Sequence, residues 1–279
     1  MDFGLSDDHR LLRDTVREFA RAEVALVAEG LDATKSFPYE IVSRLGELDL
    51  MGIPFPERYG GAGGDALAYA LVVEELARVG ERHPGYEAGT PYRKMGWNAS
   101  DTRPLSFQDC HVPAENLVGP RGEGLRQFLR VLDIGRIGVA AMGVGLAQGA
   151  LDQALEYASQ RRAFGRPASR FQTIQAKLAD MSAEIEATRL MVHKAAWLKE
   201  TGADFTLTAA QAKLTSGRLA VRAADEAVQI HDGYGYIQGY PICRFYRDAK
   251  ILTISEGTDE IQQMVIARAT GRVSPRCKA

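Results

Sequence analysis

Residues 125–161, LRQFLRVLDIGRIGVAAMGVGLAQGALDQALEYASQR, predict one long helix. Small residues along this helix permit a second helix to approach closely: Gly143, Gly145, Ala147, Gly149 and Ala150. Two more long helices are predicted over residues 172–200 and 206–230, and a shorter one over residues 258–270. Three long helices with short connections and a fourth shorter one indicate an antiparallel four-helix bundle, which we assign to residues 122–273.

The chain before the bundle divides into a predicted helical part and a part with little helix. Helices are predicted to begin at Ser6, at Pro38 and at Asp65, which makes residues 1–80 a partial N-terminal helical domain. Residues 81–121 are rich in proline, glycine and polar residues, and their clearest strand is Leu105–Gln108. A sheet this small is not stable by itself, so a remnant β segment is expected within a mainly α fold.

Composition excludes several classes of function. The formal charge of −2 and the scattered basic residues argue against nucleic-acid binding. The apolar runs are short and broken by glycine, so no membrane insertion is expected. The three cysteines have no metal-ligand spacing, which predicts no metal site and free thiols in a reducing cytoplasm. No targeting segment is expected before the first helix.

Four segments, in this order, resemble the acyl-CoA dehydrogenase family, of short- or medium-chain type. They are Glu57–Gly61 with Tyr69–Ala77; Ser100–Arg103 through Gly119; Gly135–Gly138 with Arg161–Pro167 and Phe171–Met181; and Gln229–Tyr236 with Tyr246–Lys250 and Glu256–Gln262. The resemblance implies a FAD-dependent oxidoreductase of fatty acid oxidation. The chain departs from the family between residues 79 and 83, where roughly a domain's worth of sequence, including the family's flavin loops, is absent.

The resemblance makes Glu256 the candidate catalytic base. In the family, a carboxylate in this Glu-Gly-Thr turn removes the α-proton of the substrate, and the backbone N–H of the same residue hydrogen-bonds the reacting thioester. Gly257 is expected to allow the close approach of the substrate to this backbone. Such a base needs a near-neutral pKa, and burial against an apolar acyl pocket raises the pKa of a carboxylate. The structural alternative is an acidic residue at a helix start, because Thr258 and Glu260 follow.

Two more substrate residues are implied by resemblance. Asp133 and Arg136 are expected to face the CoA moiety, where a guanidinium suits anionic groups. Their alternative is an ion pair on the helix surface at a spacing of three residues. Some relatives carry the base immediately before this arginine, but position 135 is glycine here, which favours Glu256.

The remaining residues of the predicted site match FAD-binding positions, in part across a dimer interface. They are Arg161, Phe164, Gln172, Gln229, Gly233, Thr258 and Glu260. A basic turn between helices explains the arginine cluster equally well, and a helix–helix turn explains Gln229–Gly233. The family usually has two adjacent glycines where this chain has Asp232-Gly233, and a carboxylate there would repel a pyrophosphate.

The predicted function is α,β-dehydrogenation of a fatty acyl-CoA to a trans-2-enoyl-CoA. The implied partners are FAD, an electron-transfer flavoprotein and further copies of the chain, as a homodimer or homotetramer. Two alternatives remain open. One is an inactive, truncated helical protein that oligomerises and no longer binds FAD. The other keeps the flavin but changes the chemistry, as in acyl-CoA oxidases, which pass electrons to oxygen, or family members that use different substrates.

Overall fold

The computed structural model describes residues 86–100, 102–112, 114, 117 and 119–271, together with isolated positions between residues 22 and 47. The helices predicted to begin at Ser6, Pro38 and Asp65 lie outside the continuously described residues. The chain divides into two compact units, Met1–Gln127 and Phe128–Ala279, which are considered separately below.

The described part of the first unit contains one small sheet. Strand β1 (Tyr86–Ala88) pairs antiparallel with β2 (Leu105–Phe107), with Tyr86 opposite Phe107 and Ala88 opposite Leu105. The predicted strand at Leu105 is therefore confirmed. All three side chains of β2 are exposed, including the apolar Leu105 and Phe107, which share one face because side chains alternate along a strand.

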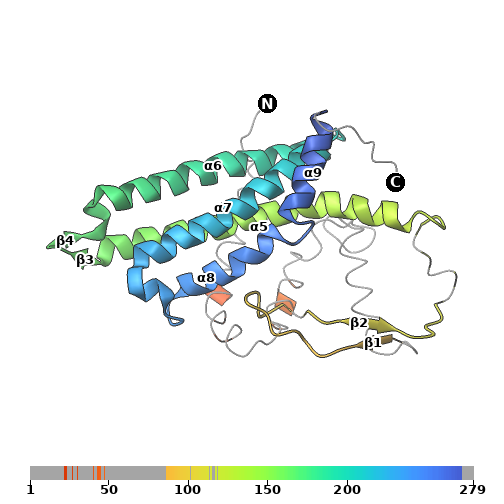
Figure 1. The fold of residues 1–279 in the computed structure, drawn as a ribbon, viewed down its shortest axis with the longest axis horizontal. Coiled ribbons are helices and arrows are strands. Elements are labelled where there is room, and N and C mark those ends of the chain that lie inside the picture. Colours follow the sequence, from red (N-terminus) through yellow and green to blue (C-terminus); the bar gives the residue numbers. More distant parts are fainter. Residues whose placement is uncertain are drawn as a thin grey trace. The chain divides into compact units, whose positions relative to one another are not determined.

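The second unit is helical (Figure 1). Its long helices are α5 (Gly124–Gln160), which begins within the first unit, α6 (Gln172–Glu200) and α7 (Thr206–His231). Shorter helices α8 (Pro241–Ala249) and α9 (Asp259–Ala269) follow, with 3₁₀ turns η5 (Asp232–Tyr236) and η6 (Lys250–Thr253) before and after α8. The predicted bounds of α6 are confirmed at both ends, and those of α5, α7 and α9 within one residue.

Helix α8 was not predicted. It begins with a proline, whose fixed φ suits the first helical position, and its nine residues separate into an apolar and a polar face. Both signals of a short helix were therefore present in the sequence. Both α8 and α9 pack against α7, which also packs against α6.

The core lies among α5, α6 and α7, with Ile242 of α8 added to it. Many of its members are alanines, so the helix backbones approach closely. At Gly143 of α5 an added Cβ would lie 2.9 Å from the Ser216 carbonyl oxygen of α7, whereas at Gly145 it would meet nothing within 4 Å. Within the described part of the chain no helix combines the length and apolar character that a bilayer-spanning segment requires.

Candidate functional site

Glu256 lies in the turn between η6 and α9. Its φ is 53°, and the φ of Gly257 is 89°, so two successive residues adopt the left-handed region. Glycine adopts that region freely, but a glutamate there is strained and needs support from its surroundings. Such conformations gather at functional sites, so the conformation of this turn supports a role for Glu256 in chemistry.

The Glu256 carboxylate reaches across to α5. A Cβ added to Gly135 would lie 2.5 Å from Glu256 Oε2, and that oxygen is shielded from solvent. Helix α5 can accept the carboxylate only because residue 135 has no side chain. Gly135 occupies the position at which some relatives carry the catalytic base, and in this chain it forms the surface that Glu256 contacts.

Arg136 and Asp133 lie beside this contact on α5. The Arg136 Nη1 donates a hydrogen bond to Asp133 Oδ1, so the ion pair at a spacing of three residues does form. It is not a surface pair, since the Arg136 residue is only 5% exposed. Burial raises the pKa of the Asp133 carboxyl, and the charge of Arg136 opposes that rise. Arg136 Nε is buried and has no hydrogen-bond partner among the described residues, so a donor remains for a polar ligand.

Two side chains that the sequence analysis did not select hold the turn itself. Lys213 of α7 donates from Nζ to the Gly257 carbonyl oxygen at 2.7 Å, and Gln262 of α9 donates from Nε2 to the carbonyl oxygens of Glu256 and Gly257 at 3.0 and 2.9 Å. Both residues are fully buried. The signal for Lys213 was present in the sequence: a lysine four residues after Ala209 and three before Ser216 is in register with the buried small-residue face of α7.

Thr258 and Glu260 lie next to the same turn, at the start of α9. Thr258 is the N-cap residue, but its side chain makes no capping hydrogen bond. Its hydroxyl instead donates to the Glu260 carboxylate, and this contact is the largest cause of the lowered pKa of Glu260. Six predicted residues are thus brought to one region: Asp133, Arg136, Glu256, Gly257, Thr258 and Glu260.

The other five predicted residues lie at the far end of α5. Strands β3 (Arg162–Ala163) and β4 (Arg166–Pro167) form a hairpin directly after α5, with a two-residue turn at Phe164-Gly165. Both turn residues have positive φ, 48° and 78°, as a type I′ turn requires. The turn places the Phe164 ring in solvent, where it is 96% exposed.

Arg161, Gln172, Gln229 and Gly233 surround the base of that hairpin and the end of α7, and all four are exposed. The Arg161 guanidinium lies 5.7 Å from the centre of the Tyr234 ring, which joins the end of α5 to η5. An exposed cation beside exposed aromatic rings fits the phosphates and the flat rings of a dinucleotide, so these residues suit the FAD that the sequence implies. Asp232 is exposed as well, with φ 55° and ψ −141°.

The two groups cannot meet within one copy of the chain. Gly135 and Gln160 are 25 residues apart on one continuous helix, or about 38 Å at a rise of about 1.5 Å per residue. Figure 1 shows the β3–β4 hairpin at one end of the helices and α9 well away from it.

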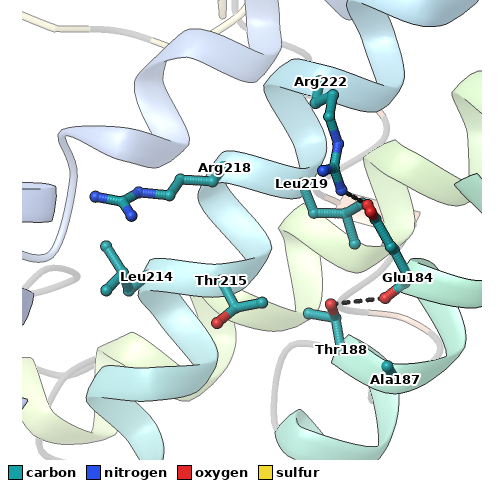
Figure 2. A pocket seen from close by; sticks show the side chains of 8 residues that line it. All are labelled: Glu184, Ala187, Thr188, Leu214, Thr215, Arg218, Leu219 and Arg222. Carbon is teal, nitrogen blue, oxygen red and sulfur yellow. Dashed lines mark hydrogen bonds and ion pairs between the residues drawn. The ribbon is translucent and has the colours of Figure 1, made fainter. Parts of the chain in front are cut away.

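An open groove between α6 and α7 contains none of the predicted site residues. It has a volume of about 480 Å³ and is lined by Glu184, Ala187, Thr188, Leu214, Thr215, Arg218, Leu219 and Arg222. Figure 2 shows Arg222 paired with Glu184, while Arg218 extends to the other side. There its Nε donates to Asp259 Oδ2 of α9 at 2.8 Å. Both arginines of the groove already have carboxylate partners.

Comparison with known proteins identifies relatives over nearly the whole chain. Residues 6–88 match the N-terminal domain of acyl-CoA dehydrogenases, and residues 122–271 match the C-terminal domain. A probable acyl-CoA dehydrogenase of Bacillus subtilis is 36% identical, covering 96% of this chain and 99% of the relative.

Solved structures agree with the sequence matches. Butyryl-CoA dehydrogenase of Megasphaera elsdenii superposes with a TM-score of 0.89 at 32% identity, covering 98% of this chain and 100% of the other. A structure described as the electron transferring flavoprotein of Acidaminococcus fermentans gives a TM-score of 0.90 at 31% identity, with coverage of 98% and 100%.

The alignment with the Bacillus subtilis relative also reveals an internal gap. It is 376 positions long, whereas this chain has 279 residues, so at least 97 positions (376 less 279) have no counterpart here. The two domain matches leave residues 89–121 between them. The family's reaction is FAD-linked dehydrogenation of an acyl-CoA. On both matched domains and on relatives that span its length, this chain belongs to the acyl-CoA dehydrogenase family of flavin-dependent oxidoreductases.

Proposed function

We propose that this chain dehydrogenates a fatty acyl-CoA at the α,β bond, with Glu256 as the base. One observation carries the proposal: the Glu256 carboxylate is set against Gly135 of α5, beside the buried Arg136–Asp133 pair. A carboxylate, a spare guanidinium donor and a glycine turn meet at one point. These are the groups needed to bind an anionic CoA ester and to remove a proton next to its carbonyl.

Each residue has a defined part in the reaction. Glu256 accepts the α-proton and becomes the neutral acid. Gly257, without a side chain, lets the thioester carbonyl approach the turn's backbone N–H groups, which stabilise the negative charge that develops there. Arg136, oriented by Asp133, binds the CoA portion. When bound, FAD supplies the acceptor of the β-hydride. The product is the trans-2-enoyl-CoA, and Glu256 is left protonated.

We propose that each complete site is built from two copies of the chain. Gln160, which directly precedes Arg161 and the hairpin, lies about 38 Å from Gly135 along α5, so one copy does not bring both groups to one cofactor. In a symmetric dimer the exposed hairpin of one copy serves the site of the other, with Thr258 and Glu260 of that other copy beside the same cofactor. The 96% exposure of Phe164 supports this, because a large apolar side chain at a hairpin tip gains from a partner surface.

The relatives support the proposed substrate and electron acceptor. Butyryl-CoA dehydrogenase is among the similar solved structures, so a short acyl-CoA is the first substrate to test. A structure described as an electron transferring flavoprotein also matches, which supports such a protein as the electron acceptor. Cys243 is a free thiol, which suits a reducing cytoplasm.

The visible absorption spectrum of the protein purified with added FAD tests the function. We expect a flavin spectrum that bleaches when butyryl-CoA is added under anaerobic conditions, and no bleaching with Glu256→Gln. Colourless, helical protein would instead identify the truncated remnant that no longer binds FAD. Oxygen consumption without an added electron acceptor would identify an oxidase.

Mixing two inactive variants tests the shared site. If Glu256 and Arg161 act in one site from different copies, a dimer of Glu256→Gln with Arg161→Ala contains one intact site. Random exchange of subunits should then restore about a quarter of the wild-type activity. If both residues served a site from the same copy, every site would carry one defect and mixing would restore nothing.

A further inference from the structure

Lys213 is a buried cation with an unusual partner. It lies on α7 with no exposed surface, and among the described residues its ammonium donates to a single acceptor, the neutral carbonyl of Gly257. Burial lowers the pKa of Lys213, and the nearby Arg136 lowers it further, while Asp259, Glu256 and Glu260 raise it. A buried ammonium without a hydrogen-bonded carboxylate is unfavourable. The cost of burying Lys213 indicates that it has a function at the turn that it contacts.

Gln262 contacts the same turn from α9, which follows the turn in the chain, whereas Lys213 belongs to α7, which precedes it. Its side-chain atom nearest the turn faces two carbonyl oxygens, those of Glu256 and Gly257, so that atom must be the amide nitrogen. Together, Lys213 and Gln262 make three hydrogen bonds to two successive carbonyls. The Gly257 oxygen accepts two of them and so uses both of its lone pairs.

We propose that Lys213 and Gln262 are positioning residues that hold the Glu256-Gly257 backbone in its left-handed conformation and thereby aim the Glu256 carboxylate at the substrate. The inference rests on the proposed role of Glu256 as the base. A glutamate at φ 53° would relax to an ordinary conformation if its neighbours allowed it. Two fixed carbonyls prevent that relaxation, because rotation of φ or ψ at residue 256 or 257 would break at least one of the three hydrogen bonds.

The packing of α7 and α5 around the turn restricts its movement. An added Cβ at Gly217, one turn along α7 from Lys213, would lie 2.6 Å from the Leu252 carbonyl oxygen, so α7 contacts the chain on both sides of Ser255. The carboxylate itself lies against the backbone of Gly135. A displacement of the base of about 1 Å can slow a reaction about 100-fold, so a base in this position needs a fixed backbone.

Two variants remove the hydrogen bonds while preserving side-chain volume: Lys213→Met and Gln262→Met. The matched control is Leu219→Ala, a core substitution on α7 at a residue only 3% exposed, which loosens the bundle without touching the turn. Unfolding curves of all three variants establish how much general stability each has lost.

Amide hydrogen exchange tests the restraint without cofactor or activity. The amides of Ile254 and Ser255 donate to the Ile251 carbonyl, and that of Gln262 donates to Thr258. We expect Lys213→Met and Gln262→Met to raise exchange at these amides about tenfold or more while α6 remains protected. Leu219→Ala should raise exchange in α6 and α7 instead. Unchanged exchange in the turn, or a rise spread over the bundle as in the control, overturns the proposal.

Kinetics then connect the restraint to Glu256. In the FAD-loaded enzyme each Met variant should lower kcat about 10- to 100-fold with little change in KM. In a Glu256→Gln background the same substitutions should lower the residual rate no further, because the group they position is gone. An equal loss in both backgrounds means that Lys213 and Gln262 do not act through Glu256. If Glu256→Gln alone retains the wild-type kcat, the assignment of the base fails, whereas the exchange measurement still decides whether the restraint exists.

Discussion

The carboxylate of Glu256 occupies the space that a side chain at position 135 would fill. A Cβ on Gly135 would lie 2.5 Å from Oε2 and 2.8 Å from Cδ of Glu256, closer than non-bonded atoms approach. One residue lies in the middle of α5 and the other in the turn before α9, 121 positions later (256 less 135). The absence of a side chain at one position is thus a condition for the location of the proposed base at the other.

Gly135→Ala should therefore separate activity from stability. The added methyl group displaces the end of a flexible side chain, which can rotate away, so the free energy of unfolding should change by no more than about 1 kcal/mol. Rotation moves the base, however, and kcat should fall about 100-fold. Steady-state kinetics and chemical denaturation on the same preparation measure the two effects.

Gly138→Ala is the matched control on the same helix. A Cβ at Gly138 meets nothing within 4 Å, so the substitution should leave kcat unchanged and stabilise α5 by about 0.5–1 kcal/mol. If Gly135→Ala were as active as Gly138→Ala, the proximity of Gly135 and Glu256 would have no catalytic meaning.

Within residues 119–271 the sequence predicted the long helices well but not the way they meet. Length located α5, α6 and α7, whereas α8 has only nine residues and was missed although its apolar and polar residues lie on different faces. The resemblance selected Glu256 but gave no indication that Gly135 faces it. Lys213 was not selected from the sequence because a lysine on a helix is usually exposed to solvent. The helices that pack around Lys213 decide its burial, and their arrangement is known only from the structure.

The glycines of α5 illustrate the same limit and give a second prediction. Sequence alone treated Gly143 and Gly145 alike, as small residues that permit close packing. In the structure a Cβ on Gly143 would lie 2.9 Å from the Ser216 carbonyl oxygen, which is backbone and cannot rotate away, whereas Gly145 faces open space. Gly143→Ala should cost about 1–3 kcal/mol of unfolding free energy. Gly145→Ala should add up to about 1 kcal/mol. Equal effects in urea denaturation would contradict the close approach of α5 and α7.

Replacement of Asp232 by glycine should raise the stability of the protein. Its φ of 55° and ψ of −141° lie where a Cβ is strained, and the family usually has glycine there. Glycine at position 232 relieves backbone strain of about 1–3 kcal/mol in the folded state. This gain exceeds the cost of the greater conformational entropy that glycine gives the unfolded chain, so Asp232→Gly should raise the free energy of unfolding by about 1 kcal/mol. The measurement is thermal or chemical unfolding of the purified variant.

Asp232→Asn separates backbone from charge, because it keeps the Cβ and removes the carboxylate. Both variants should bind FAD more tightly if the carboxylate repels the pyrophosphate, but only the glycine should stabilise the protein. A gain in stability with asparagine equal to that with glycine would assign the effect to charge and not to backbone strain.

His231 should make the stability of the bundle depend on pH. Its ring is 3% exposed and stacks on Tyr157 with ring centres 4.2 Å apart, and its Nδ1 donates to the Ala227 carbonyl at 2.7 Å. Burial lowers the pKa of His231 below the ordinary value of 6.5, and the hydrogen bond to Ala227 opposes that only in part. Between the lowered pKa and 6.5 the unfolded chain binds more protons than the folded one. Stability therefore rises with pH through that window and is lost as the pH falls through it.

His231→Phe keeps a ring of similar size against Tyr157 and removes the titration. The difference in unfolding free energy between the wild type and this variant should be constant above about pH 7 and should shift in favour of the variant as the pH falls below 6.5. For a single proton the slope cannot exceed about 1.4 kcal/mol per pH unit. His193→Gln, at an exposed position of α6, is the control and should parallel the wild type. A difference between wild type and His231→Phe that stays constant down to about pH 5 would mean that the buried ring does not resist protonation, and that another group is responsible for any acid instability of the bundle.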